Sequence, residues 1–275
     1  MDIISKRILT YLDVISSKYN ITIILAVESG SRAWNIASED SDYDVRFIYI
    51  YNDYLKYIHE KSPCPKTITE FYEDRLIDMH GWNVDKAFHH LGQGNCSLFE
   101  WCFSPIIYYE HEKLSFRKFA SEVFELEDYA NFLCRSYRGQ TIAHYKKFIK
   151  DQKIIPAKKY LYCIRPLVAF FYFLNCSARS TYVIDIHFSL EQIKDQFGEK
   201  FYSGVIQIIE EKKKIKQEYG KLLIDPEFLE DLSNIIESQV LPWKCTKNDL
   251  DIRKLSEKKF ESLFLTLITP VTNSF

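Results

Sequence analysis

Two apolar segments joined by a polar connection constrain the fold of this chain most strongly. Residues 21–29 (ITIILAVES) and 44–51 (DVRFIYIY) each predict a β-strand, because β-branched and aromatic residues dominate both. Gly30 directly follows the first segment, and Asp42 and Asp44 lie at the start of the second. The pattern therefore predicts two neighbouring strands with a small-residue turn and a pair of acids at their ends.

The rest of the chain divides into an α/β part and a helical part, so the predicted fold class is α+β. We place the boundary near residue 115, which gives a first domain at 1–115 and a helical second domain at 116–275. The tail after Trp243 fits no element. The elements predicted in the first domain are a helix at 2–19, strands at 21–29, 44–51, 67–72 and 75–80, helices at 83–91 and 97–104, and an edge strand at 106–110.

Composition excludes several classes of protein. A chain that is 47% hydrophobic with a net charge of −2 can bury a core and is not a basic nucleic-acid coat. Its seven cysteines are odd in number and form no C-x-x-C pair, which favours reduced thiols in a cytoplasmic compartment. The most apolar run, residues 160–174, is too short to span a bilayer and contains Arg165, so we expect no membrane partner.

The acids suggest a metal site. Strand alternation places Asp42, Asp44 and Arg46 on one face, with the two acids ~7 Å apart along the backbone. Carboxylates so close repel each other unless a cation lies between them. Oxygen ligands of this kind suit Mg²⁺, which also accepts substrate phosphates. Two such ions can stabilise both the attacking and the leaving oxygen in phosphoryl displacement.

Gly30 and Ser31 supply the complementary half of such a site. A small-residue turn from strand into helix exposes backbone N–H groups that favour phosphate, and Arg32 and Arg46 add positive charge. Each element alone is more often a plain turn or a solvated acid cluster. Their combination, at this spacing and beside two strands, favours a site that holds a nucleoside triphosphate.

These residues resemble a known family. Gly-Ser, ten residues and then Asp-x-Asp is similar to the signature of the DNA polymerase β-like nucleotidyltransferase superfamily. The fuller string ESGSRAWNIASEDSDYDVRFIY, with IDMHGWNVDKAF, SLFEWCFSPIIYYE and KKYLYCIRPLVA, resembles its branch of predicted nucleotidyltransferases associated with RNA repair pathways. The matching blocks run from about Glu28 to Leu174. Asn35 departs from the pattern, which usually has Gly there, but Asn tolerates left-handed backbone.

The resemblance implies a mixed sheet flanked by helices and a third carboxylate on a later strand. Asp78 is the best candidate, since alternation puts it on one face with Leu76 and His80, and His80 is expected to be a neighbour rather than a ligand. Glu70 and Asp74 compete for the position. By resemblance, Asp42 and Asp44 would bind two Mg²⁺ ions, with Mn²⁺ able to substitute. Asp78 would bind the ion that activates the acceptor hydroxyl.

Basic and aromatic residues alternate further along the chain, between residues 135 and 165. Such a run suits phosphate contact and base stacking, although a solvated amphipathic face explains it equally well. Lys159 and Arg165 lie in a block that resembles the family, and Lys159 begins a predicted helix just after Pro156. We therefore expect Lys159 to contact the triphosphate.

The expected activity is Mg²⁺-dependent transfer of a nucleoside monophosphate from an NTP to a hydroxyl, with release of pyrophosphate. The resemblance favours an RNA end, such as that of a tRNA, as acceptor, and no DNA partner. One alternative is an enzyme that adds AMP to a protein, as some superfamily members resembling antitoxins do. Another is a non-catalytic nucleotide- or RNA-binding module on the same fold.

Overall fold

The computed structural model of the chain describes residues 2–53, 65–126, 129–152, 155–175, 184–214, 221–222 and 226–245. Within this part, the chain forms two compact units. The first contains residues 2–30, 42–53 and 65–126. The second contains residues 31–41 and the described residues from 129 to 245. Helix α6 (Phe116–Phe124), which follows the predicted boundary at residue 115, belongs to the first unit.

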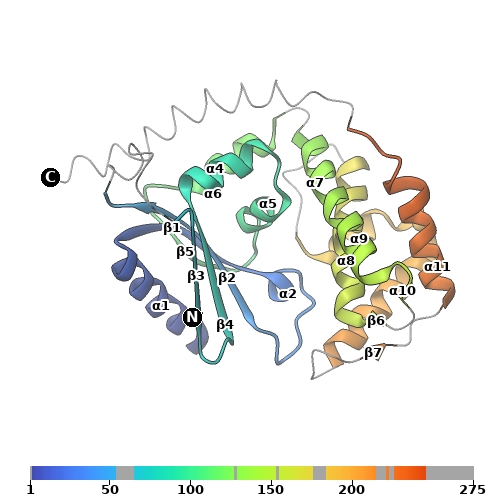
Figure 1. The fold of residues 1–275 in the computed structure, drawn as a ribbon, viewed down its shortest axis with the longest axis horizontal. Coiled ribbons are helices and arrows are strands. Elements are labelled where there is room, and N and C mark those ends of the chain that lie inside the picture. Colours follow the sequence, from blue (N-terminus) through green and yellow to red (C-terminus); the bar gives the residue numbers. More distant parts are fainter. Residues whose placement is uncertain are drawn as a thin grey trace. The chain divides into compact units, whose positions relative to one another are not determined.

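A five-stranded mixed sheet forms the centre of the first unit (Figure 1). The strand order is β3-β4-β2-β1-β5, in which β2 and β4 are parallel and the other neighbours are antiparallel. The predicted edge strand is confirmed as β5. The bounds are β1 (Ile21–Ser29), β2 (Tyr43–Tyr51), β3 (Thr67–Tyr72), β4 (Ile77–Asn83) and β5 (Ile107–Glu110).

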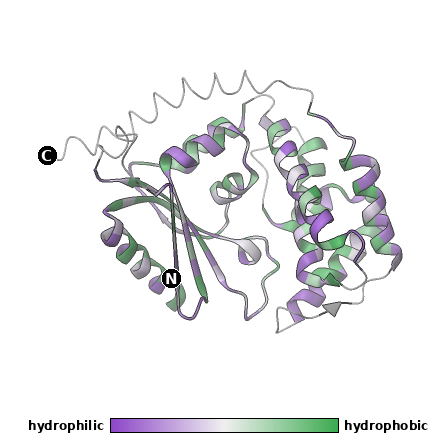
Figure 2. Ribbon diagram, in the orientation of Figure 1, coloured by the Kyte–Doolittle hydropathy of each residue, from purple (hydrophilic) through white to green (hydrophobic). Residues whose placement is uncertain are grey.

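Helices cover both faces of this sheet (Figure 1). Helix α1 (Ile3–Tyr19) begins at Asp2, whose side chain accepts a hydrogen bond from the Ser5 amide, and ends at Asn20 in left-handed conformation. Its apolar side, including Ile8 and Leu12, packs on one face of the sheet in a single hydrophobic core (Figure 2). The opposite face meets α4 (Val84–Gly92) and α5 (Cys96–Cys102).

Strand register places three polar residues, from β1, β2 and β4, in one row. Ser29 on β1 pairs with Asp44 on β2, and Asp44 pairs with Asp78 on β4. Paired residues on neighbouring strands point to the same face. Since Val45, Phe47 and Met79 fill the core against α1, this row lies on the face away from α1.

The second unit is helical, as predicted. Its longest apolar helix is α8, which is buried over most of its length and contains Pro166. A two-stranded ladder between β6 and β7 was not predicted, because two residues a strand carry no periodicity. The elements are α7 (Tyr129–His144), the π-helix η1 (Tyr145–Ile149), β6 (Ile155–Pro156), α8 (Ala157–Asn175), α9 (Ile186–Gln192), α10 (Lys194–Lys214), β7 (Lys221–Leu222), α11 (Pro226–Ile235) and the π-helix η2 (Ile236–Val240).

Some predictions fall outside the described residues. The FYSGVIQIIEEKKKIKQEY segment, residues 201–219, also has a sequence typical of a helix; its residues 201–214 form the later part of α10, and residues 215–219 are not described. The tail after residue 245 is not described either. Over the described part of the chain, every helix is too short or too polar to cross a lipid bilayer.

Gly81 on β4 offers a test of the packing between sheet and core. A Cβ at this position would lie 2.1 Å from the Phe47 ring, which is fully buried. We expect Gly81→Ala to destabilise the protein by about 1–3 kcal/mol, because the core cannot accept added volume without displacement. Urea unfolding followed by tryptophan fluorescence measures the change.

Gly139 on α7 is the matched control, since a Cβ there meets no atom within 4 Å. Gly139→Ala replaces a helical glycine, so it should leave stability unchanged or raise it by up to about 1 kcal/mol. Equal losses in both variants would contradict the packing of β4 against β2.

Candidate active site

Gly30, which directly follows β1, lies against the Asp44 carboxylate. Gly30 has φ +62°, a left-handed conformation, and a Cβ built on it would lie 2.0 Å from Asp44 Oδ2. Glycine is therefore required twice, for the backbone angle and for the close approach of the carboxylate. Gly30 and Asp44 are therefore neighbours within the first unit.

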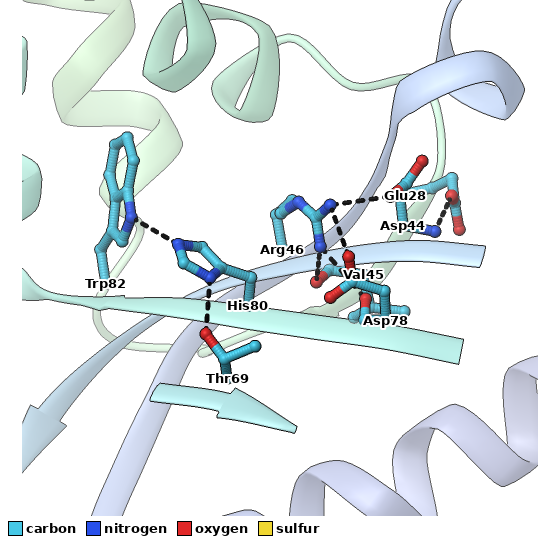
Figure 3. A network of polar contacts seen from close by, with 8 residues as sticks. All are labelled: Glu28, Asp44, Val45, Arg46, Thr69, Asp78, His80 and Trp82. Carbon is cyan, nitrogen blue, oxygen red and sulfur yellow. Dashed lines mark hydrogen bonds and ion pairs between the residues drawn. The ribbon is translucent and has the colours of Figure 1, made fainter. Parts of the chain in front are cut away.

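Arg46 joins the two acids of the row (Figure 3). Its Nη2 lies 2.7 Å from Asp44 Oδ1 and 3.3 Å from Asp78 Oδ2, and its Nη1 donates to the Asp78 carbonyl at 3.1 Å. The guanidinium side chain is 17% exposed and the carboxylates about a third exposed, at 30% and 31%. A single positive charge thus lies between two carboxylates that repulsion would otherwise drive apart.

The other predicted acids differ in position. Asp42 lies two residues before Asp44, just ahead of β2, and is exposed. Glu70 points to the opposite face, where it accepts hydrogen bonds from Lys18 and Tyr19 of α1. Asp74 lies in the turn between β3 and β4 with φ +51°. Of the three candidates for the later carboxylate, Asp78 is the one beside Asp44.

The carboxylate oxygens of Asp44 and Asp78 suit a hard cation, although the described residues contain no preformed group of three metal ligands. No group of three Asp, Glu, His or Cys residues in this part of the chain is arranged to bind a metal ion. Asp44 and Asp78 form a pair that already shares one cationic group, and Asp78 Oδ1 is buried without a hydrogen-bond partner. Adjacent carboxylate oxygens with spare acceptor capacity fit Mg²⁺.

Glu28 holds the strand end that carries Asp44, and sequence patterns did not single it out. It is fully buried; its Oε1 accepts from the Asp44 backbone amide at 2.7 Å, and its Oε2 accepts from the Tyr108 hydroxyl. Ser104 donates to the Glu28 carbonyl at 2.6 Å. A buried carboxylate must have such partners. A charged residue in an otherwise apolar strand, ITIILAVES, was the available signal.

His80 is the next residue along the acid face of β4, and both its ring nitrogens are engaged (Figure 3). The Trp82 indole donates to Nε2 at 3.0 Å, and Nδ1 lies 2.9 Å from Thr69 Oγ1. Trp82 in turn packs against Trp101 of α5, with ring centroids 4.2 Å apart. His80 is therefore a neighbour of the acids held by its own partners, as predicted, and the two tryptophans are core anchors.

The remaining predicted residues belong to the second unit. Arg32 donates to the Ser41 carbonyl at 2.6 Å, and Asn35, with φ +59°, adopts the left-handed conformation expected of it. Arg165 stacks on Trp34 at 3.9 Å. Lys159 lies near the start of α8, and its Nζ is 4.7 Å from the centroid of the Phe148 ring and 5.0 Å from that of the Tyr162 ring. Ser31 follows Gly30 in the short helix α2 (Gly30–Ala33).

Within the second unit, Lys212 on α10 binds residues 31–41, the segment between Gly30 and Asp42 in the sequence. Its Nζ donates to the Ile36 carbonyl at 2.7 Å and to Ser41 Oγ at 3.2 Å. Burial lowers the pKa of Lys212 to about 8, and the positive charge of Lys158 is the second largest cause. Periodicity could not predict this contact, because 171 residues separate Lys212 from Ser41.

A mixed sheet flanked by helices is the fold that the resemblance to polymerase β-like nucleotidyltransferases implied, and in it Gly30 lies against one of the acids. The sequence model described as "RNA repair pathway DNA polymerase beta family" (RlaP) matches residues 4–183. This match covers more than half of the 275 residues, and the chain belongs to that family.

Two further similarities accompany the family match. The uncharacterized protein YcgL of Bacillus subtilis (strain 168) is 36% identical over 174 residues, which is 60% of this chain and 61% of that protein, less than two thirds of its length. A nucleotidyltransferase-like protein from Exiguobacterium sibiricum 255-15, known from its crystal structure, aligns over 95% of this chain and 91% of its own at 12% identity. Its TM-score of 0.30 is too low to support an argument about shape.

His80 provides a test of the geometry around the acid face. Burial first, and then the positive charges of Arg46 and Lys86, lower the pKa of His80 below 6.5. The unfolded chain then binds more protons than the folded one in this range, so stability should fall as the pH drops through about 6.5 towards the folded pKa. Thermal melting between pH 5 and 8 should show a weaker pH dependence in His80→Gln.

The hydrogen bond from Trp82 also fixes the tautomer, because Nε2 accepts and the proton must lie on Nδ1. Nitrogen-15 NMR of the ring at pH 7.5 should report a neutral imidazole protonated at Nδ1. An Nε2-protonated ring, or a pKa at or above 6.5, would contradict this network.

Proposed function

We propose that the protein is a Mg²⁺-dependent nucleotidyltransferase that moves a nucleoside monophosphate from an NTP to a hydroxyl group and releases pyrophosphate. The observation that supports this most strongly is the register pairing of Asp44 with Asp78, with Gly30 directly against the Asp44 carboxylate. Membership of the RNA repair pathway DNA polymerase beta family favours the same reaction class. We expect the protein to act in the cytoplasm.

In this proposal the acids divide the work. Asp42 and Asp44 would bind Mg²⁺ together with the triphosphate, and Asp78 would bind the ion on the acceptor side and help to deprotonate the hydroxyl. When bound, Mg²⁺ would neutralise the charge that develops on the phosphoryl oxygens. Arg46 would keep the two carboxylates together before the substrate arrives. Glu28 would hold the Asp44 backbone in place.

The Gly30 turn would supply the phosphate side of the site. With no side chain at this position, the backbone of Gly30 and Ser31 can approach a phosphate closely and donate to it through N–H groups. Arg32, Lys159 and Arg165 are the cationic residues that we propose for contact with the nucleotide. The acceptor we propose is an RNA end, because the family is associated with RNA repair.

Substitution of the paired acids tests the proposed reaction. Each of Asp44→Ala and Asp78→Ala should reduce incorporation from an NTP at least about a thousandfold, or ~4 kcal/mol in the transition state, because a metal ligand is lost. The assay incubates the protein with each α-labelled NTP, Mg²⁺ and total cellular RNA or protein, and separates the labelled products. Removal of Mg²⁺ by chelation should abolish labelling, and Mn²⁺ should restore it.

Asp85→Ala is the matched control, since Asp85 is an exposed acid on α4 that pairs with Lys66. It should label at the wild-type rate. Labelling that survives Asp42→Ala combined with Asp44→Ala would refute the site. Label found in protein rather than RNA would leave the reaction class standing and change the acceptor.

Lys159 tests the nucleotide contact separately. We expect Lys159→Ala to raise KM for the NTP about tenfold with little change in kcat, because a phosphate contact made in both ground and transition state is lost. Lys147, whose ammonium group lies over the same Phe148 ring at 5.0 Å, is the control. If Lys147→Ala and Lys159→Ala raise KM equally, the specific contact with Lys159 is wrong.

A further inference from the structure

The acid row continues beyond Asp78 to an exposed aromatic side chain. Phe71 on edge strand β3 pairs in register with Asp78, so the row runs Phe71, Asp78, Asp44, Ser29 across four strands. Paired residues share a face, so Phe71 points to the same side as the acids. It is 45% exposed, so part of its ring is accessible to a ligand.

Arg75 lies over the Phe71 ring, with its guanidinium carbon 4.2 Å from the ring centroid. The turn that returns Arg75 to this position contains three consecutive residues with positive φ, at Glu73, Asp74 and Arg75. On the side of the turn that faces α1, Glu73 forms an ion pair with Arg7 and accepts a hydrogen bond from the Tyr11 hydroxyl at 2.9 Å. The turn thus separates Glu73, held by α1, from Arg75, which lies with the exposed ring.

We propose that Phe71 and Arg75 form the binding platform for the terminal nucleoside of a single-stranded RNA acceptor. A base would stack on the Phe71–Arg75 pair, and the Arg75 guanidinium would contact the adjacent phosphate. This inference rests on the proposed function, because it assigns the acceptor side of the same site. Aromatic rings and guanidinium planes are the two surfaces on which proteins stack unpaired bases.

The order of residues along the row supports the assignment. Neighbouring strands lie ~4.8 Å apart, so Phe71 is about one strand from Asp78, two from Asp44 and three from the Gly30 turn. The phosphate side and the ring therefore lie at opposite ends of the row, with the acid proposed to activate the hydroxyl between them. An acceptor whose base rests on Phe71 would present its sugar hydroxyl towards Asp78.

The combination of an aromatic ring and a positive charge favours a nucleic acid over a ligand that is only acidic or only apolar. A phenyl ring offers stacking area to any base, and Arg75 is an exposed cation that suits a phosphate. A peptide acceptor on edge strand β3 would need side-chain pockets in addition to strand hydrogen bonds. Stacking with one phosphate contact needs only the pair that is present.

Substitutions at the platform test the proposal through the acceptor rather than the nucleotide. Phe71→Ala and Arg75→Ala should each raise KM for a single-stranded RNA acceptor at least about fivefold. This factor corresponds to the lower limit of the affinity lost with one stacked base. KM for the NTP should stay within about twofold of wild type. Phe71→Tyr, which keeps the ring, should bind RNA as wild type does, and Arg75→Lys should recover only part of the affinity because the plane is lost.

Tyr109 is the matched control, an aromatic residue 38% exposed on the opposite edge strand, β5. Tyr109→Ala should change neither KM. Direct binding separates this inference from the proposed function: fluorescence anisotropy with labelled single-stranded RNA is measured in the Asp44→Ala, Asp78→Ala protein, with and without Phe71→Ala. Weaker RNA binding on loss of the ring supports the platform even where no transfer is detected.

Three results would overturn the platform. These are unchanged RNA affinity in the folded Phe71→Ala protein, an equal rise of KM for the NTP, or an equal loss of RNA binding in Tyr109→Ala. The first of these results, found together with labelling of protein, would refute the platform while leaving nucleotidyl transfer intact. Circular dichroism and melting temperature establish that each variant is folded, and Arg75→Ala keeps the test decisive if Phe71→Ala unfolds, since unchanged RNA affinity in that variant would also contradict the platform.

Discussion

The arrangement depends on two carboxylates held next to each other on parallel strands. Asp44 and Asp78 are register partners, and without a positive group between them their charges would oppose the pairing of β2 with β4. Arg46, two residues along β2, binds both and lies on the same face because of strand alternation. Arg46 therefore places positive charge between the two carboxylates, where a bound divalent ion would also place it.

Supporting contacts fix this pair from the side of the core. The buried Glu28 side chain binds the Asp44 amide, and Tyr108 binds Glu28 in turn, so three strands, β1, β2 and β5, set the position of one acid. Gly30 allows the chain to turn directly against the Asp44 carboxylate, which no residue with a Cβ could do. On β4, Thr69 and Trp82 hold the His80 ring in place, and burial lowers the pKa of this ring.

Much of the fold could be predicted from the sequence, because its strands and helices show clear periodicity. Alternation in DVRFIYIY predicted that Asp44 and Arg46 share one face, and alternation in RLIDMH predicted that Asp78 shares one with His80. That these two faces are the same depends on the pairing of β2 with β4, which alternation does not contain. The contacts of Glu28 and Lys212 could not be predicted, because each depends on residues distant in sequence. The bridging role of Arg46 and the position of Phe71 depend on strand order, which periodicity does not contain.

A crystal soaked or grown with Mn²⁺ and a non-hydrolysable NTP analogue would test the central claim most directly, since Mn²⁺ scatters anomalously. The account predicts an anomalous peak coordinated by the carboxylates of both Asp44 and Asp78, with the analogue's phosphates beside Gly30 and the Arg46 guanidinium moved away from at least one acid. A peak elsewhere, or an analogue bound while Arg46 still joins both acids and no ion contacts them, would contradict it.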